Sequence, residues 1–293
     1  MAKLPLTAYE NLVRMALAED IGSGDATTNA IIPTEATGTA RMVAREELLV
    51  CGLDIAAYVF RSLDPKLSVQ EFAQDGELVG SGQPLLSIQG SSRALLTAER
   101  TALNFVQKLS GIATLARTFC NLIADLPTRL LDTRKTTPGW RTLEKYAVAC
   151  GGGTNHRIGL HDMILIKDNH IVTLEGSLPN PIHKAVKLAR QHHPNLKIEV
   201  ETDTLEQVQQ AVEAGADIVL LDNMPPNQIK KAVGIVNGRC KTEASGGIKL
   251  NSIRSIAECG VDFISIGALT HSSPSVDIGL DFDLTAPPKQ RPL

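Results

Sequence analysis

Aromatic residues are scarce in this sequence: Phe, Trp and Tyr make up 3% of its 293 residues. An excess of either charge is missing too, because 29 Lys and Arg face 32 Asp and Glu, a formal net charge of −3. With 43% hydrophobic residues, this balance excludes disorder as the main state. It also argues against a nucleic-acid partner, for which a basic excess is typical.

Long apolar runs are missing as well. No run approaches the ~20 residues that a membrane helix needs, so no membrane partner is expected. The first twenty residues, MAKLPLTAYENLVRMALAED, mix acids into an amphipathic pattern and lack the basic-then-apolar order of a signal peptide. The five cysteines form no CxxC pair, which indicates neither a disulfide framework nor a zinc site. These absences predict a cytoplasmic protein with free thiols.

Small and branched residues are plentiful, which is typical of an α/β protein. In the first part of the chain, residues 9–19 have helical periodicity, and short strand-like runs such as TARMVARE and PLLSIQG follow between glycine-rich turns. Residues 93–124 are then expected to form one or two helices, with a break at Gly111.

From about residue 128 onward, strand-like and helical runs alternate, which predicts a parallel sheet with right-handed crossovers. The expected helices lie at 140–150, 181–193, 204–215, 225–237 and 250–260, and the expected strands are 128–132, 162–167, 197–201, 217–221, 240–244 and 262–266. The echo between EAGAD at 213–217 and ECGVD at 258–262 favours a repeating βα barrel over a doubly wound sheet. Six strands are too few to close a barrel, so an open, incomplete βα barrel is predicted.

Polar residues follow every one of these strands, where the active site of a βα barrel is built. They are Asp132, Thr133, Arg134 and Lys135, then Lys167 and Asp168, Glu201, Asp222 and Asn223, Ser245, Gly246 and Gly247, and Gly267 and Ala268. Strand ends are often exposed and polar for no functional reason. Six in succession, divided by charge type, favour a functional site.

The division by charge indicates the ligand. Residues 129–167 hold seven Lys and Arg against three acids, although the whole chain is slightly acidic. Such a cluster suits a ligand with several carboxylates or phosphates. Glu201 and Asp222 could hold sugar hydroxyls, a divalent cation or a developing positive charge. The glycines after the last two strands let backbone N–H groups approach a phosphate.

Several motifs together resemble the quinolinate phosphoribosyltransferase family. They are LTAERTALNFVQKLSGIAT, LDTRKTTPGWRTLEKYAVACGGGTNHRIGLHDMILIKDNHI, EVE followed by LLDN, EASGGI and GVDFISIGALTHS, with EDIGSGDATT near the start. The resemblance covers nearly the whole chain, and its departure is a few extra residues, EGSLPNPIHK, in a loop. It implies transfer of a phosphoribosyl group from phosphoribosyl diphosphate to quinolinate with loss of CO₂, in NAD biosynthesis, with Mg²⁺ as cofactor.

The resemblance also implies the architecture. An N-terminal α/β sandwich domain, residues 1–112, is joined by the C-terminal tail, 270–293, and accompanies an open βα barrel, 113–269. It implies a homodimer or a higher homo-oligomer in which Arg100 of one subunit completes the active site of another.

Site residues are carried over from the same motifs. Quinolinate and the diphosphate are implied to bind at Arg100, Thr133, Arg134, Lys135, His156, Arg157 and Lys167. Glu201 and Asp222 match the acidic pair at the ribose and Mg²⁺, and with Lys135 they are the implied catalytic residues. Ser245, Gly246, Gly247, Gly267 and Ala268 match the 5-phosphate site.

Three alternatives stay open. A sister enzyme of the same fold could use another acceptor, and a phosphoribosyl or nucleotide sensor could bind without catalysis. An aldolase could form a Schiff base at Lys167, which has the required strand-end position.

Overall fold

The structure, a computed structural model, describes residues 3–283. It divides into two compact units. The first comprises the chain up to Leu115, Pro138–Gly151 and the chain from Ser273, and the second comprises Ala116–Thr137 and Gly152–Ser272. The domain limits expected from the sequence stay a prediction, and residues 284–293 of the expected tail lie outside the described residues.

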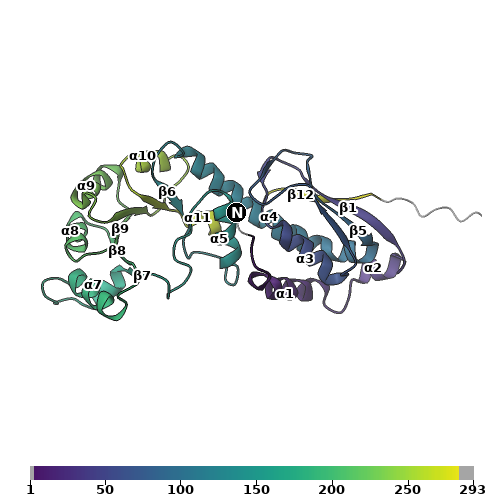
Figure 1. The fold of residues 1–293 in the computed structure, drawn as a ribbon, viewed down its shortest axis with the longest axis horizontal. Coiled ribbons are helices and arrows are strands. Elements are labelled where there is room, and N and C mark those ends of the chain that lie inside the picture. Colours follow the sequence, from purple (N-terminus) through teal and green to yellow (C-terminus); the bar gives the residue numbers. More distant parts are fainter. Residues whose placement is uncertain (1–2, 284–293) are drawn as a thin grey trace, which may run out of the picture. The chain divides into compact units, whose positions relative to one another are not determined.

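The first unit contains an antiparallel sheet of four strands in the order β12-β1-β5-β3. Side chains alternate between the two faces of a strand. Ala40, Met42 and Ala44 of β1 share one face and are all fully buried, so this is the buried face of the sheet. Helices accompany this sheet, with α3 and α4 beside it in Figure 1. The elements are α1 (Glu10–Ile21), α2 (Ala26–Ile31), β1 (Thr37–Ala44), β2 (Leu48–Leu49), α3 (Leu53–Leu63), β3 (Ser68–Glu71), β4 (Leu78–Val79), β5 (Pro84–Ser91), the start of α4 (Ser92–Leu122), α5 (Arg141–Cys150) and β12 (Ile278–Asp283).

The expected break at Gly111 is wrong, because α4 runs as one helix from Ser92 to Leu122. Gly111 has a packing role instead. A Cβ built at this position would lie 2.0 Å from the backbone oxygen of Pro274. The glycine therefore lets the segment before β12 approach the helix more closely than any side chain would allow.

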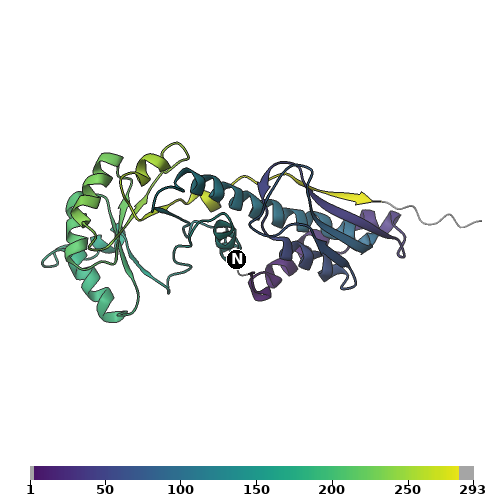
Figure 2. The same cartoon turned by 45° about the horizontal axis from the view of Figure 1, so that its top comes forward.

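The second unit contains six parallel strands in the order β6-β11-β10-β9-β8-β7, with β6 and β7 at the edges. The helices α7 to α10 lie in an arc along one side of these strands (Figure 2). The elements are β6 (Arg129–Leu131), β7 (Ile164–Ile166), α6 (Asp168–Val172), α7 (Pro181–His192), β8 (Ile198–Thr202), α8 (Leu205–Glu213), β9 (Ile218–Asp222), α9 (Pro226–Val236), β10 (Lys241–Ser245), α10 (Ile253–Ala257), β11 (Phe263–Ser265) and α11 (Ala268–His271). This confirms the predicted open βα barrel.

The echoed EAGAD and ECGVD motifs have a common structural task. Asp217 accepts a hydrogen bond from the backbone N–H of Ile198 at 2.7 Å, and Asp262 accepts one from Thr242 at 2.9 Å. Each aspartate precedes one strand and holds the first residues of the neighbouring strand. The repeat therefore fixes the strand register that aligns the carboxyl ends of the sheet.

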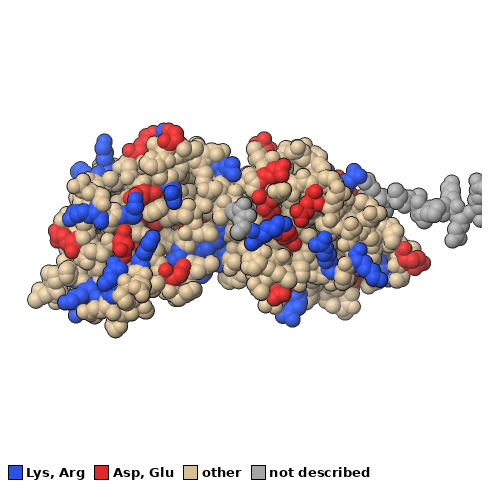
Figure 3. Space-filling view, in the orientation of Figure 1, with Lys and Arg blue, Asp and Glu red and all other residues tan. Residues whose placement is uncertain are grey.

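Charged side chains of both signs are interspersed on the visible face of the molecule (Figure 3), in keeping with the net charge of −3. Among residues 3–283, no helix has both the length and the apolar character needed to cross a membrane.

Candidate active site

A cavity of about 550 Å³ lies at the carboxyl ends of the strands in the second unit. It gathers most of the residues that the sequence singled out. Its lining contains Thr133, Arg134, Lys135, His156, Arg157, Lys167, Glu201, Asp222, Asn223, Ser245, Gly246 and Gly247, together with Leu165, Leu220, Glu243 and Ser265. The expectation that strand-end residues meet in one place is therefore confirmed for these positions.

One part of the cavity lining consists of cationic side chains. Arg134 and Lys135 follow β6, in a turn where the Thr133 hydroxyl accepts the Lys135 N–H at 3.0 Å. The Nε of Arg134 is buried without a hydrogen-bond partner. Burial, and then the charge of Arg134, lowers the pKa of Arg157. Two adjoining guanidinium groups, one with an unused buried donor, would be stabilised by a carboxylate ligand.

Carboxylates from two neighbouring strands line the cavity too. Glu201 is the penultimate residue of β8 and Asp222 is the last residue of β9. Asp222 accepts a hydrogen bond from the Asn223 amide at 2.7 Å. The Lys167 ammonium forms an ion pair with Glu201 at 3.0 Å, in the lining of the same cavity.

A tight glycine turn after β10 forms another part of the lining. Gly246 has a φ of +102°, and a Cβ there would lie 2.2 Å from Oδ1 of Asn223. Asn223 itself has a positive φ of 53° and donates its backbone N–H to Ser245 at 2.9 Å. Both the backbone conformation and the close approach require glycine at this position.

Gly246→Ala is expected to unfold at a lower temperature and to bind a phosphate-bearing ligand more weakly. An alanine there is strained at positive φ, by about 1 kcal/mol or more, and also displaces Asn223. Calorimetry and ligand titration measure the two effects. Gly215→Ala is the matched control, because Gly215 has a φ of +82° and open space around it. Equal loss of ligand affinity in both variants would contradict a specific role for the turn.

Three of the site residues that the family resemblance implies lie outside this lining, as do the strand-end residues Asp132 and Asp168. Gly267 lies against Lys135, because a Cβ there would be 2.8 Å from the lysine Cδ. Ala268 begins the short helix α11. Arg100 belongs to the first unit, where it is exposed and lines a separate cavity of about 300 Å³ with Asp20, Asp25 and other residues.

Sequence reasoning missed two buried acids, Glu199 on β8 and Glu243 on β10. Their relative exposures are 0% and 1%. Burial raises the pKa of both carboxyl groups, and at Glu243 the charge of Glu199 raises it further. His156 lies between them, with its Nε2 at 3.0 Å from Glu199 and 3.5 Å from Glu243. The signal in the sequence was spacing, because Glu199 and Glu201, like Glu243 and Ser245, are two residues apart and share a strand face.

Glu243→Gln is expected to stabilise the protein increasingly as the pH rises. The folded pKa of Glu243 is above that of the unfolded chain, so the native state binds more protons and the free energy of unfolding falls with rising pH. Glutamine has no proton to lose and avoids this fall. Denaturant unfolding from about pH 5 to about pH 9 should show the gap widening by about 1 kcal/mol or more.

The control for this prediction is Glu206→Gln, because Glu206 is exposed on α8. Its unfolding free energy should stay parallel to that of the unaltered protein over the same pH range. A gap between Glu243→Gln and the unaltered protein that is constant with pH would contradict the prediction.

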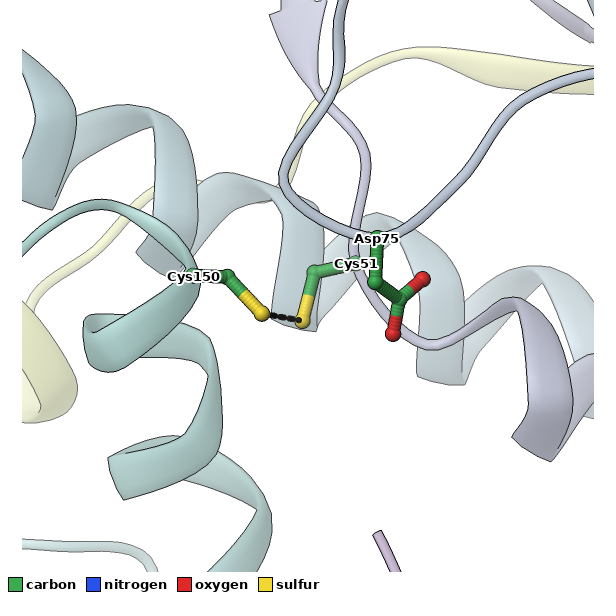
Figure 4. Close-up of side chains that lie close together, drawn as sticks. All are labelled: Cys51, Asp75 and Cys150. Atoms are coloured by element: carbon green, nitrogen blue, oxygen red, sulfur yellow. Dashed lines mark hydrogen bonds between the residues drawn. The ribbon is translucent and has the colours of Figure 1, made fainter. Parts of the chain in front are cut away.

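Two further clusters bring possible metal ligands together in the described residues. In the first unit, the sulfurs of Cys51 and Cys150 point toward one another at 3.5 Å, near Asp75 (Figure 4). The Asp75 carboxylate already accepts the N–H groups of Gly52 and Leu53 and the Tyr146 hydroxyl. Burial raises the pKa of the Cys51 thiol, whereas a metal needs the thiolate. This cluster therefore has little capacity for a metal.

The second cluster is His156, Glu199 and Glu243. His156 Nδ1 accepts the backbone N–H of Arg157 at 2.7 Å, so a neutral ring carries its proton on Nε2. That nitrogen faces the two acids and has no lone pair for a metal. Glu201 and Asp222 fit a divalent cation better, because they offer carboxylate oxygens in an open cavity and hard cations such as Mg²⁺ prefer oxygen ligands.

The fold and the cavity define an open βα-barrel protein whose strand-end cavity combines cationic side chains with the carboxylates of Glu201 and Asp222. Family models narrow this class. Residues 25–110 match the N-terminal domain of quinolinate phosphoribosyl transferase, and residues 112–281 match its C-terminal domain. The chain belongs to the quinolinate phosphoribosyl transferase family.

Individual relatives agree with the family models. The chain is 46% identical over 268 residues to a probable nicotinate-nucleotide pyrophosphorylase [carboxylating] of Synechocystis sp., covering 90% of this chain and 89% of the relative. It is 42% identical to the protein of the same name from Bacillus subtilis, with 94% of each covered. The solved nicotinate-nucleotide pyrophosphorylase of Francisella tularensis is 44% identical, with a TM-score of 0.89 over 96% of this chain and 98% of that one.

Proposed function

We propose that this protein transfers a phosphoribosyl group from phosphoribosyl diphosphate to quinolinate and releases diphosphate, CO₂ and nicotinate mononucleotide, a step of NAD biosynthesis. One observation carries the proposal. A single cavity combines four cationic side chains, the carboxylates of Glu201, Asp222 and Glu243, and a glycine turn. These match the dicarboxylate and diphosphate, the ribose and the 5-phosphate.

The cationic side chains have two tasks in this reaction. Arg134 and Arg157, the latter next to His156 in the chain, orient the two carboxylates of quinolinate so that its ring nitrogen faces C1 of the ribose. Lys135 and Lys167 hold the diphosphate as its bond to C1 breaks. Both tasks use charge-assisted hydrogen bonds, the stronger class of protein hydrogen bond.

Positive charge develops on the ribose as the diphosphate departs. Glu201 and Asp222 stabilise this charge because their carboxylates are already fixed in the cavity. The nitrogen of quinolinate then bonds to C1 and becomes positively charged. The C2 carboxylate leaves as CO₂, its bonding electrons pass to C2, and a proton replaces it there. The turn formed by Ser245, Gly246 and Gly247 binds the 5-phosphate through backbone N–H groups, with Gly267 and Ala268 included in this proposed subsite.

Mg²⁺ belongs to the proposal as the cofactor. Glu201 and Asp222 would hold it, together with oxygens of the substrate. The ion would neutralise negative charge on the departing diphosphate.

The active unit is proposed to be a homodimer or a larger homo-oligomer. Arg100 is exposed and lies outside the main cavity of its own chain. It is therefore available to a neighbouring subunit, where it would bind a quinolinate carboxylate. A cytoplasmic location is also proposed, and the free state of all five cysteines supports it.

Ligand discrimination tests the acceptor. Quinolinate carries carboxylates at C2 and C3, nicotinate only the one at C3, and picolinate only the one at C2. Losing one charge-assisted partner costs about 1.5–3 kcal/mol, so both monocarboxylates should bind about tenfold or more weakly in calorimetric titrations. Equal affinity for nicotinate and quinolinate would contradict the dicarboxylate assignment and favour the sister-enzyme alternative.

A further inference from the structure

The proposed mechanism leaves two buried acids of the barrel without a task. The Glu199 and Glu243 side chains are 0% and 1% exposed and approach Nε2 of His156 at 3.0 and 3.5 Å. Oε1 of Glu199 and both carboxylate oxygens of Glu243 lack a hydrogen-bond partner. Burying carboxylate oxygens in this way is unfavourable for folding, so the arrangement calls for a functional explanation.

The hydrogen bonds of His156 determine where its proton lies. Nδ1 accepts the backbone N–H of Arg157 at 2.7 Å. A neutral imidazole has one N–H donor and one acceptor nitrogen, so the proton is on Nε2. That N–H points at Glu199, and both ring nitrogens are therefore used within the protein.

The other contacts of this segment connect the ring to the acceptor site. The backbone N–H of His156 donates to the buried Asp132 at 2.8 Å. The Arg157 guanidinium donates to the carbonyl of Met163 at 3.1 Å and lines the cavity. The imidazole thus holds the backbone from which the Arg157 side chain extends.

We propose that Glu199 and Glu243 are positioning residues, which hold His156 as its Nε2–H tautomer so that the ring fixes Arg157 for the acceptor. His156 then acts through Arg157, and its nitrogens do not bind the acceptor carboxylates. That the acceptor is quinolinate rests on the proposed function. The Nε2–H tautomer of His156, and the part that the two acids have in holding it, are inferred from the contacts within the protein alone.

The alternative explanation of this cluster is a metal-binding site, because each of the three side chains offers one ligand atom and these atoms lie within 4.8 Å of one another. A metal on Nε2 would require the proton to leave that nitrogen. The positioning role and the metal site therefore predict different protonation of Nε2 of His156: this nitrogen carries a proton in the first case and none in the second.

The first measurement is NMR on the unaltered protein with ¹⁵N-labelled histidine, with the His156 signals assigned by their loss in His156→Asn. We expect a protonated Nε2 and an unprotonated Nδ1. In Glu199→Ala/Glu243→Ala the ring should become a mixture of tautomers. An Nδ1–H ring, an imidazolium, or a stoichiometric metal ion found by elemental analysis in the unaltered protein would overturn the proposal.

The second measurement is kinetic. In the double alanine variant, KM for quinolinate should rise about tenfold or more, because a displaced Arg157 no longer meets its carboxylate, while kcat and KM for phosphoribosyl diphosphate change less than about threefold. The single variant Glu199→Gln keeps a side-chain oxygen that accepts the hydrogen bond from Nε2 of His156. Its KM for quinolinate should therefore stay near that of the unaltered protein. Unchanged quinolinate KM, or an equal rise for both substrates, would overturn the proposal.

Thr202→Val is the matched control for loss of barrel packing. Thr202 is a buried residue of β8 whose hydroxyl donates to the Leu220 carbonyl at 2.9 Å, and it lies on the strand face opposite Glu199 and Glu201. Its quinolinate KM should stay unchanged. If the double variant does not fold, the tautomer of the unaltered protein still decides. The NMR measurement of the tautomer needs no catalytic turnover. A protein that does not convert quinolinate would therefore contradict the proposed function without changing the result for the tautomer.

Discussion

Glu201→Gln and Asp222→Asn are each expected to lower kcat by more than about tenfold. The amides keep the size of the side chains but remove the negative charge, which matters most as positive charge builds on the ribose. Both acids line the cavity that holds the cationic side chains. Steady-state kinetics with both substrates saturating measure this effect directly.

Quinolinate binding provides the complementary readout for these two variants. In the absence of phosphoribosyl diphosphate, its affinity should change by less than about twofold, because the proposed function assigns these acids to the ribose and not to the dicarboxylate. Asp203→Asn is the control, an exposed acid directly after β8 that does not line the cavity. A near-normal kcat in both variants would contradict the assigned role, and a large loss of quinolinate affinity would place these residues at the acceptor site.

Arg100→Ala is expected to reduce activity severely while the fold and the oligomer persist. Its guanidinium is exposed, so truncation leaves no cavity in the core. Loss of one charge-assisted carboxylate partner costs about 1.5–3 kcal/mol, or about tenfold to a hundredfold in quinolinate affinity. Arg61→Ala, an exposed arginine on α3, should remain fully active.

Subunit mixing tests whether Arg100 acts on a neighbouring chain. Arg100→Ala and Lys135→Ala subunits co-assembled at random should recover about a quarter of the unaltered activity, because half of the dimers are hybrids with one intact site of two. Co-expression with two different affinity tags gives the hybrids directly. Purified hybrids without activity would show that Arg100 serves only its own chain.

The sequence predicted the strands of the second unit closely, because strand-like and helical runs alternate there. The expected strand at 217–221 is β9 (Ile218–Asp222), and the expected strand at 240–244 is β10 (Lys241–Ser245). Short helices were harder to predict. Helices α6 and α11 were not expected, and α10 spans only Ile253–Ala257 of the expected 250–260. So few residues carry too little periodicity to be recognised.

Gly111 shows the limit of local patterns. A glycine inside a helical pattern suggested a break in the helix. The structure shows instead that a glycine is needed at this position because the backbone of Pro274, more than a hundred residues later in the chain, packs against it. Glu199 and Glu243 show the same limit in the site. Acids in a strand normally indicate an exposed face, and only the pairing of β8, β9 and β10 brings these two to one histidine. Spacing places each acid on the same strand face as a predicted site residue, but the proximity of the two acids to one another depends on the order of the strands in the sheet.

Decarboxylating phosphoribosyl transfer can be followed through the products of one reaction mixture. Purified protein is incubated with phosphoribosyl diphosphate, Mg²⁺ and quinolinate carrying ¹³C in its C2 carboxylate, and the mixture is followed by NMR and mass spectrometry. We expect unlabelled nicotinate mononucleotide, labelled CO₂ and diphosphate in equal amounts. Absence of the nucleotide, or a nucleotide that retains the labelled carboxylate, would contradict it.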